Sequence, residues 1–253
     1  MSEILGMTRF REHFKSFSDN YVLIGGSACS ILMNESSLSY RTTKDFDLVL
    51  CVEALSHEFV NHFWDFIKEG EYSTVHKSSG EKCFYRFTEP KNNSYPYMLE
   101  ILSDKVDIHG ERAPGSIIPM KVNEEIVSLS AILLNKEYYA FIMGLKRVVE
   151  DIMIADHYVI IPLKARAFLE LSERKARGER IQSDDIKKHR NDIYRLTQLL
   201  PLRVLEDVPE IVSKDIRAFV EQAYDDDLLL RQIGVDILTM TDIKDTLMLV
   251  YCP

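Results

Sequence analysis

The sequence has little of what stabilises small secreted or membrane-inserted proteins. Its 253 residues include only four cysteines, and no two of them form a Cys-x-x-Cys pair. This pattern does not support a disulfide framework, and free thiols in a reducing compartment are expected. No apolar run approaches the roughly 20 residues of a membrane span, and the charged N-terminus lacks the apolar core of a signal peptide. We therefore expect a cytoplasmic protein with no membrane partner.

An excess of basic residues is also missing. The chain has 31 Lys and Arg against 40 Asp and Glu, a formal net charge of -9. Such a balance argues against a protein that coats nucleic acid without sequence specificity. A local basic groove is still compatible with it, because the electrostatic field depends on how the charges are distributed. The apolar content of 46% and charged content of 28% are typical of globular proteins. The length allows one large domain or two small ones.

The most informative stretch, residues 21–50, begins with a short apolar run and a glycine turn. Residues 21–24 predict a buried strand, and Gly25, Gly26 and Ser27 then lead into a helix. Glycines let the backbone come close to a ligand, and the free N–H groups of a helix start attract anions. The arrangement predicts a phosphate-binding turn, whereas a glycine pair alone is typical of an ordinary turn.

Two aspartates mark the start of the next predicted strand, residues 46–52. Side chains alternate along a strand, so Asp45 and Asp47 lie on the face opposite Phe46. Two carboxylates on one face beside a phosphate-binding turn could hold Mg²⁺ against a nucleoside triphosphate. An Asp-x-Asp pair alone is typical of a solvated strand start, so the prediction depends on the combination.

The two motifs together resemble the nucleotidyltransferase superfamily, in which a glycine-serine turn and a helix precede Asp-x-Asp on the next strand. The segment at residues 41–47, RTTKDFD, has the Arg-x-Thr-x-Asp-x-Asp form of the abortive-infection (AbiEii-like) branch, whose members include toxins of type IV toxin–antitoxin systems. The gap between Ser27 and Asp45 is longer than the superfamily's usual spacing. Residues 34–40 are therefore expected to form an extra loop.

A third carboxylate candidate lies in the apolar segment of residues 97–103. A carboxylate inside an apolar strand is costly unless it is paired or binds a cation. By the resemblance, Glu100 takes the place of a third metal-binding or base carboxylate, which is usually Asp in the wider superfamily. The alternatives are an edge-strand Glu100 that faces water, and Asp104 as the carboxylate in its place.

The second half of the chain carries a local excess of positive charge on two predicted helices, residues 163–175 and 184–200. Ten Lys or Arg stand against six Asp or Glu between residues 164 and 195. This segment indicates an anionic partner, and a solvated charged face is an equal alternative. In the resembled family, a Lys of the first helix contacts the nucleotide phosphates and an Asp of the next helix completes the site. Lys164 and Asp192 match them.

The resemblance, which covers roughly residues 20–200, implies a set of site residues. It makes Asp45, Asp47 and Glu100 the catalytic and metal-binding carboxylates, with Mg²⁺ or Mn²⁺ as cofactor. The implied nucleotide-binding residues are Gly25, Gly26, Ser27, Arg41, Thr43, Lys44, Lys164 and Asp192.

The remaining pattern predicts further elements on either side of the site. Helices are expected over residues 3–17, 53–68, 138–144, 211–224 and 237–250, a hairpin over residues 72–77 and 82–87, and a strand within residues 148–154. Residues 129–135 are apolar but of uncertain type.

The expected fold is α/β (α+β): a nucleotidyltransferase-type mixed sheet flanked by helices, then a mainly helical domain. We expect residues 1–127 to form the catalytic domain and residues 128–253 to complete its cleft. The implied reaction transfers a nucleoside monophosphate from a nucleoside triphosphate to an acceptor, with tRNA suggested by the basic segment and a cognate antitoxin as a partner. The alternatives are a non-catalytic nucleotide-binding module and an aminoglycoside-type, small-molecule nucleotidyltransferase.

Overall fold

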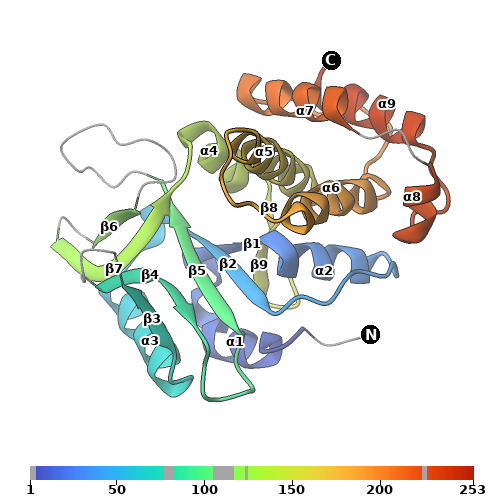
Figure 1. The fold of residues 1–253 in the computed structure, drawn as a ribbon. Helices are drawn as coiled ribbons and strands as arrows, with labels where there is room; N and C mark the ends of the chain where they lie inside the picture. Colours follow the sequence, from blue (N-terminus) through green and yellow to red (C-terminus); the bar gives the residue numbers. More distant parts are fainter. Residues whose placement is uncertain (1–3, 77–81, 105–116, 123–124, 224–226) are drawn as a thin grey trace. The chain divides into compact units, whose positions relative to one another are not determined.

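The computed structural model describes residues 4–76, 82–104, 117–122, 125–223 and 227–253. Within these ranges, nine strands form one mixed sheet with flanking helices, and a mainly helical region, α5 to α9, follows (Figure 1). The predicted fold class is thereby confirmed. No helix of the described ranges is both long and apolar enough to cross a membrane.

The chain divides into two compact units. Unit 1 comprises Met1–Ile31 and Arg41–Ala155, and unit 2 comprises Leu32–Tyr40 and Asp156–Pro253. The mainly helical unit thus starts later than the boundary predicted near residue 127. The reason is strand pairing, because β7 (Glu125–Leu133) pairs with β5 and the hairpin of β8 (Lys146–Val149) and β9 (Ile152–Ala155) pairs with β1.

The sheet of unit 1 has the order β3-β4-β5-β2-β1-β9-β8, and β6 and β7 extend it from β5. The central pairs are antiparallel β1–β2 and parallel β2–β5, while antiparallel β3–β4 confirms the predicted hairpin. The strands not yet located are β1 (Tyr21–Ile24), β2 (Asp45–Leu50), β3 (Ser73–His76), β4 (Lys82–Thr88), β5 (Met98–Ser103) and β6 (Ile117–Val122).

Two helices, α1 (Met7–Phe14) and α3 (His57–Glu69), cover one face of this sheet. Phe10 of α1 meets the rings of Tyr21 and Phe46 edge-on, each at a centroid distance of 5.2 Å. Phe46 is fully buried, while its neighbours Asp45 and Asp47 are only partly so. The alternation predicted for this strand is confirmed, and both aspartates lie on the face away from the helices.

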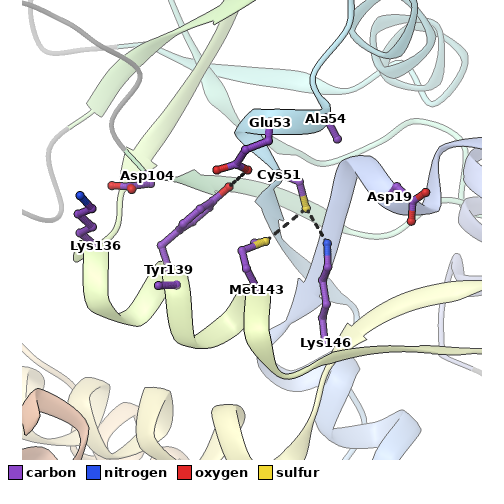
Figure 2. A pocket seen from close by; sticks show the side chains of 10 residues that line it. Asp19, Cys51, Glu53, Ala54, Asp104, Lys136, Tyr139, Met143 and Lys146 are labelled. Atoms are coloured by element: carbon purple, nitrogen blue, oxygen red, sulfur yellow. Dashed lines mark hydrogen bonds between the residues drawn. The ribbon is translucent and has the colours of Figure 1, made fainter. Parts of the chain in front are cut away.

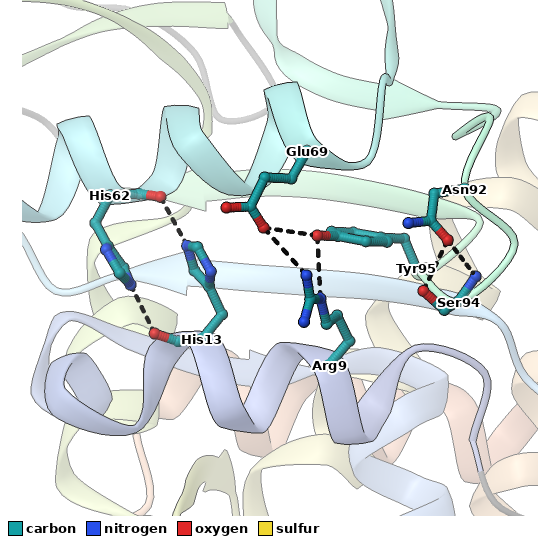
Figure 3. Close-up of polar contacts among 7 residues, drawn as sticks. All are labelled: Arg9, His13, His62, Glu69, Asn92, Ser94 and Tyr95. Atoms are coloured by element: carbon teal, nitrogen blue, oxygen red, sulfur yellow. Dashed lines mark hydrogen bonds and ion pairs between the residues drawn. The ribbon is translucent and has the colours of Figure 1, made fainter.

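Polar contacts hold α1 against α3 (Figure 3). The rings of His13 and His62 stack at 4.0 Å, and each Nε2 donates to the other residue's backbone carbonyl, at 3.0 and 2.6 Å. Arg9 Nε donates to the hydroxyl of Tyr95 at 3.1 Å, and that hydroxyl donates to Glu69 at 2.8 Å.

Shorter elements of unit 1 are η1 (Lys15–Asn20), η2 (Val52–Ala54) and α4 (Lys136–Gly144), while α2 (Gly25–Glu35) continues into unit 2.

Unit 2 packs its helices around an apolar core that includes Ile193, Ile216, Phe219 and Leu247. Its elements are α5 (His157–Ala176), α6 (Ser183–Thr197), α7 (Glu210–Gln222), α8 (Asp227–Gln232) and α9 (Met240–Tyr251). Together they account for the mainly helical character predicted for the end of the chain.

Helix α5 starts earlier than its predicted first residue, 163. Asp156 caps it by accepting a hydrogen bond from the Tyr158 N–H, so Pro162 falls inside the helix. Proline has no N–H to donate to the carbonyl four residues earlier, which here belongs to Tyr158. The hydroxyl of Tyr251 donates to this carbonyl instead, at 3.1 Å. A side chain from α9 thus satisfies the group that the proline leaves open.

Candidate active site

The glycine turn lies directly against the Asp-x-Asp strand. Strand β1 ends at Ile24, which pairs with Asp47, and α2 begins at Gly25. Gly25 has a φ of +69°, and a Cβ on it would lie 1.9 Å from Asp47 Oδ2. Only glycine therefore brings the helix start this close to the carboxylate.

A second set of contacts joins this turn to the residues before β2. The Ser27 hydroxyl is buried and donates to the backbone carbonyl of Asp45 at 2.6 Å. A Cβ on Gly26 would lie 2.8 Å from Thr43 Oγ1 and 3.4 Å from Arg41 Nη2. The structure thus brings Arg41 and Thr43 beside the turn, while the Ser27 hydroxyl serves the turn's own geometry.

Three charged side chains line up across neighbouring strands. Asp47 on β2 is in register with Glu100 on β5, and Glu100 is in register with Arg86 on β4. Arg86 Nε donates to Glu100 Oε1 at 2.5 Å, and its Nη2 contacts the same oxygen. The Glu100 side chain is 16% exposed and that of Arg86 40%. Glu100 is thus the partly buried partner of a cation.

Arg86 is a candidate site residue that the sequence analysis does not single out. Burial disfavours its charge, but the nearby carboxylates of Glu100 and Asp47 outweigh this and raise its pKa above the ordinary value. The available signal is a charged residue inside the aromatic segment FYRF, residues 84–87, which requires a carboxylate partner. The identity of that partner depends on strand order.

The carboxylates of β2 provide a donor set that suits a divalent cation bound together with phosphate. Oδ1 of Asp45 is buried and has no hydrogen-bond partner among the described residues. Within the same residues, no group of three His, Cys, Asp or Glu side chains is arranged to hold a metal ion. Magnesium ions are often held by only one or two carboxylates, with substrate phosphates and water as the other ligands. Asp45 and Asp47 fit this pattern, whereas Glu100 is paired with Arg86.

Lys44, the remaining predicted residue of this region, lies against an aromatic ring. Its Nζ is 3.8 Å from the ring centroid of Tyr97, and its carbonyl accepts from the Tyr97 N–H at 2.8 Å. A cation over a tyrosine face gains a cation–π contact, worth about 0.5–1 kcal/mol at an exposed position. Lys44 therefore connects the segments that lead into β2 and β5.

The two predicted residues of unit 2 contact each other directly. Lys164 on α5 donates to Asp192 Oδ2 on α6 at 2.7 Å, with side-chain exposures of 6% and 0%. Arg195 Nη1 lies 3.5 Å from the other oxygen of Asp192. A buried carboxylate is costly to leave unpaired. Here two cations offset the charge of Asp192. The pair thus has a structural role in unit 2, and a role toward nucleotide stays a prediction.

The positive excess of residues 164–195 is largely used in short ion pairs on the surface of unit 2. Lys187 and Lys188 pair with acidic residues three positions earlier, and Arg174 pairs with Glu179 at 2.8 Å. Exposed pairs of this kind are typical of a solvated helix face. They give little support to a dedicated anion-binding surface.

No protein-family model matches the chain, and no curated protein matches it either. The resemblance to nucleotidyltransferases therefore stays an expectation from the motif residues of the sequence.

Proposed function

We propose that the protein is a metal-dependent nucleotidyltransferase, which moves a nucleoside monophosphate from a nucleoside triphosphate to an acceptor. The observation that carries the proposal is the buried Oδ1 of Asp45, which has no protein partner among the described residues and lies on the same strand face as Asp47. A buried, unpartnered carboxylate oxygen is costly, so it is best explained by a cation that arrives with the substrate.

Each residue around the turn has a role in this proposal. Asp45 and Asp47 would hold Mg²⁺ or Mn²⁺, which when bound would neutralise charge that develops on the leaving pyrophosphate. The backbone N–H groups at the start of α2 would bind phosphate oxygens, since Gly25 and Gly26 are only partly buried. Arg41 beside Gly26 would add a charge-assisted contact.

Glu100 takes a positioning role in this proposal. Its carboxylate holds the Arg86 guanidinium in the row that also contains Asp47. An arginine that is fixed beside the metal carboxylates can stabilise negative charge on phosphate oxygens. Arg86 therefore joins the proposed site, and Glu100 contributes through it.

The same ion pair also favours a second candidate function. A carboxylate that is held by Arg86 is poorly placed to draw a proton from an acceptor hydroxyl. The protein would then be a nucleotide-binding module without turnover. Transfer to tRNA, a cognate antitoxin and a cytoplasmic location stay predictions, as does an aminoglycoside-type acceptor.

A transfer assay tests the proposal. Purified protein is incubated with Mg²⁺, each of the four α-labelled nucleoside triphosphates in turn, and total tRNA, with Asp47→Ala as the control variant. Label on tRNA or on protein with the parent chain, absent with the variant, is the expected result and identifies the acceptor class. Triphosphate binding without transfer to any tested acceptor would favour the binding module. Absence of both binding and transfer would overturn the proposal.

A further inference from the structure

A cavity of about 620 Å³ lies in unit 1 at the strand ends opposite the glycine turn (Figure 2). Strand β2 runs from Asp45 at the turn end to Leu50, and Cys51 follows directly. This six-residue strand separates its two ends by five residue steps, or roughly 17 Å. The cavity is therefore separate from the candidate active site.

The wall of this cavity contains a thiol beside a primary amine. Cys51 Sγ lies 3.6 Å from Nζ of Lys146, the first residue of β8, and 3.6 Å from Sδ of Met143 on α4. Cys51 is 3% exposed, and all three side chains line the cavity. In Figure 2 the amine and the thioether both point toward the thiol. A small oxidant that enters the cavity would thus meet sulfur and nitrogen together.

Two opposing effects act on the pKa of the Cys51 thiol. Burial raises the pKa of the Cys51 thiol, and the charge of Lys146 offsets part of that rise. The nearby carboxylate of Glu53 instead accepts a hydrogen bond from the Tyr139 hydroxyl at 2.9 Å. Within the described part of the chain, the Lys146 amine donates to the Cys51 sulfur.

We propose that Cys51 and Lys146 form an oxidative modification site, in which one oxygen atom bridges Sγ and Nζ covalently when hydrogen peroxide is the oxidant. The bridge would join the end of β2 to the start of β8, 95 residues apart in sequence. These strands are not neighbours in the sheet, because β1 and β9 lie between them. The cross-link would therefore tie four strands together.

The chemistry consumes two peroxide molecules. The sulfur attacks one peroxide oxygen, the O–O bond breaks, and the thiol becomes a sulfenic acid with release of water. The neutral amine attacks a second peroxide in the same way and becomes a hydroxylamine, again with release of water. The hydroxylamine oxygen then bonds to sulfur and expels the sulfenic hydroxyl as a third water. Both peroxides are reduced, and sulfur and nitrogen are each oxidised by two electrons.

Peptide mapping by mass spectrometry after peroxide treatment of the folded protein tests the site. The expected product is a cross-linked peptide pair that contains Cys51 and Lys146 and has gained one oxygen and lost two hydrogens. A thiol reductant should release the two peptides, and the oxidised chain should unfold at a higher temperature than the reduced chain because a long loop is closed.

Lys146→Arg is the matched variant, because it keeps the positive charge beside Cys51 but removes the primary amine. It should give Cys51 sulfenic or sulfinic acid without a cross-link. Cys252 is an internal control, since the cation that acts on its thiol is Arg217. Oxidation of Cys51 in the parent without a bond to Lys146, or no oxidation of Cys51 while Cys252 reacts, would overturn the proposal. The parent's peptides decide the outcome even if the variant fails to fold.

Discussion

The two ends of strands β1 and β2 satisfy their polar groups in different ways. At the far end, the Tyr139 hydroxyl donates to Glu53 and accepts from the Val52 N–H, both at 2.9 Å. Asn20 Nδ2 at the same end donates to the Ala54 carbonyl at 2.5 Å. At the turn end, Oδ1 of Asp45 is buried without a partner among the described residues.

In the proposed function, this difference separates an end that is stabilised by internal hydrogen bonds from an end that binds a ligand. Buried polar groups are paired in most native proteins, and exceptions concentrate at functional sites. At the far end, Tyr139, Glu53 and Asn20 follow the rule with internal hydrogen bonds, and the buried group without a partner among the described residues is the neutral hydroxyl of Tyr21, not a carboxylate. The turn end instead combines the unpartnered oxygen with a left-handed glycine at Gly25. Removing a carboxylate at the turn end should therefore lower activity, whereas removing a paired polar group at the far end should lower stability and leave activity unchanged.

The largest expected effect is on transfer activity. Asp47→Ala at the turn end should lower the initial rate by about 10³-fold or more, because preorganised electrostatics supplies most of this chemistry. Tyr139→Phe at the far end should leave the rate near that of the parent chain. Initial rates with the labelled triphosphate measure both. Equal losses in the two variants would remove the functional distinction between the ends.

A pair of glycine substitutions tests the close approach at the turn. Gly25→Ala places a methyl group 1.9 Å from Asp47 Oδ2 at a φ of +69°, which should lower the free energy of unfolding by about 2–3 kcal/mol. The control is Gly144→Ala at the end of α4, where a Cβ has nothing within 4 Å. That change should be neutral or stabilise by up to about 1 kcal/mol. Denaturant unfolding of both variants gives the comparison, and similar values for the two would contradict it.

The substitutions Asp45→Asn and Tyr139→Phe each change the side-chain volume little, and they should change the free energy of unfolding in opposite directions. Asp45→Asn removes the negative charge of a carboxylate whose buried Oδ1 has no partner among the described residues, so without metal it should raise the free energy of unfolding by about 1 kcal/mol. Tyr139→Phe removes hydrogen bonds to Glu53 and Val52 and should lower it by about 1 kcal/mol. Denaturant unfolding in the presence of a chelator measures both. A loss of stability in Asp45→Asn would indicate that Asp45 is already satisfied.

The smallest effect is expected from pH, at the helix pair that covers the other face of the sheet. Burial lowers the pKa of His13, although its hydrogen bond to the His62 carbonyl opposes this. The unfolded chain therefore binds more protons than the folded chain below the ordinary histidine value of about 6.5. The contribution of His13 to the free energy of unfolding should be complete above that pH. It should decrease as the pH drops below it. His13→Gln should flatten this dependence, and an unchanged slope in the variant would assign it to other groups.

Features set by neighbouring residues could be predicted from the sequence. The strand, glycine turn, helix and Asp-x-Asp strand are local, so alternation and glycine chemistry suffice to predict them. The same holds for the hairpin of β3 and β4 and for the amphipathic helix α3.

Features that depend on strand order or on distant partners could not be predicted in this way. The Arg86–Glu100 pair requires β4 to lie beside β5, and the sequence of neither strand specifies this. The hydroxyl of Tyr251 that serves the carbonyl opened by Pro162 comes from 93 residues beyond Tyr158. The extent of unit 1 likewise depends on the pairing of β7, β8 and β9, and the sequences of these strands do not specify their partners.

The most direct test of the account is the unfolding temperature with and without Mg²⁺ and a nucleoside triphosphate, for the parent chain and for Asp45→Asn. We expect metal and triphosphate together to raise the unfolding temperature of the parent, with a gain of about 2.7 kcal/mol at a ligand concentration 100-fold above Kd. Asp45→Asn should start from a higher temperature and respond little. A parent chain that does not respond, or two chains that respond equally, would contradict the assignment of Asp45 to a metal–nucleotide site.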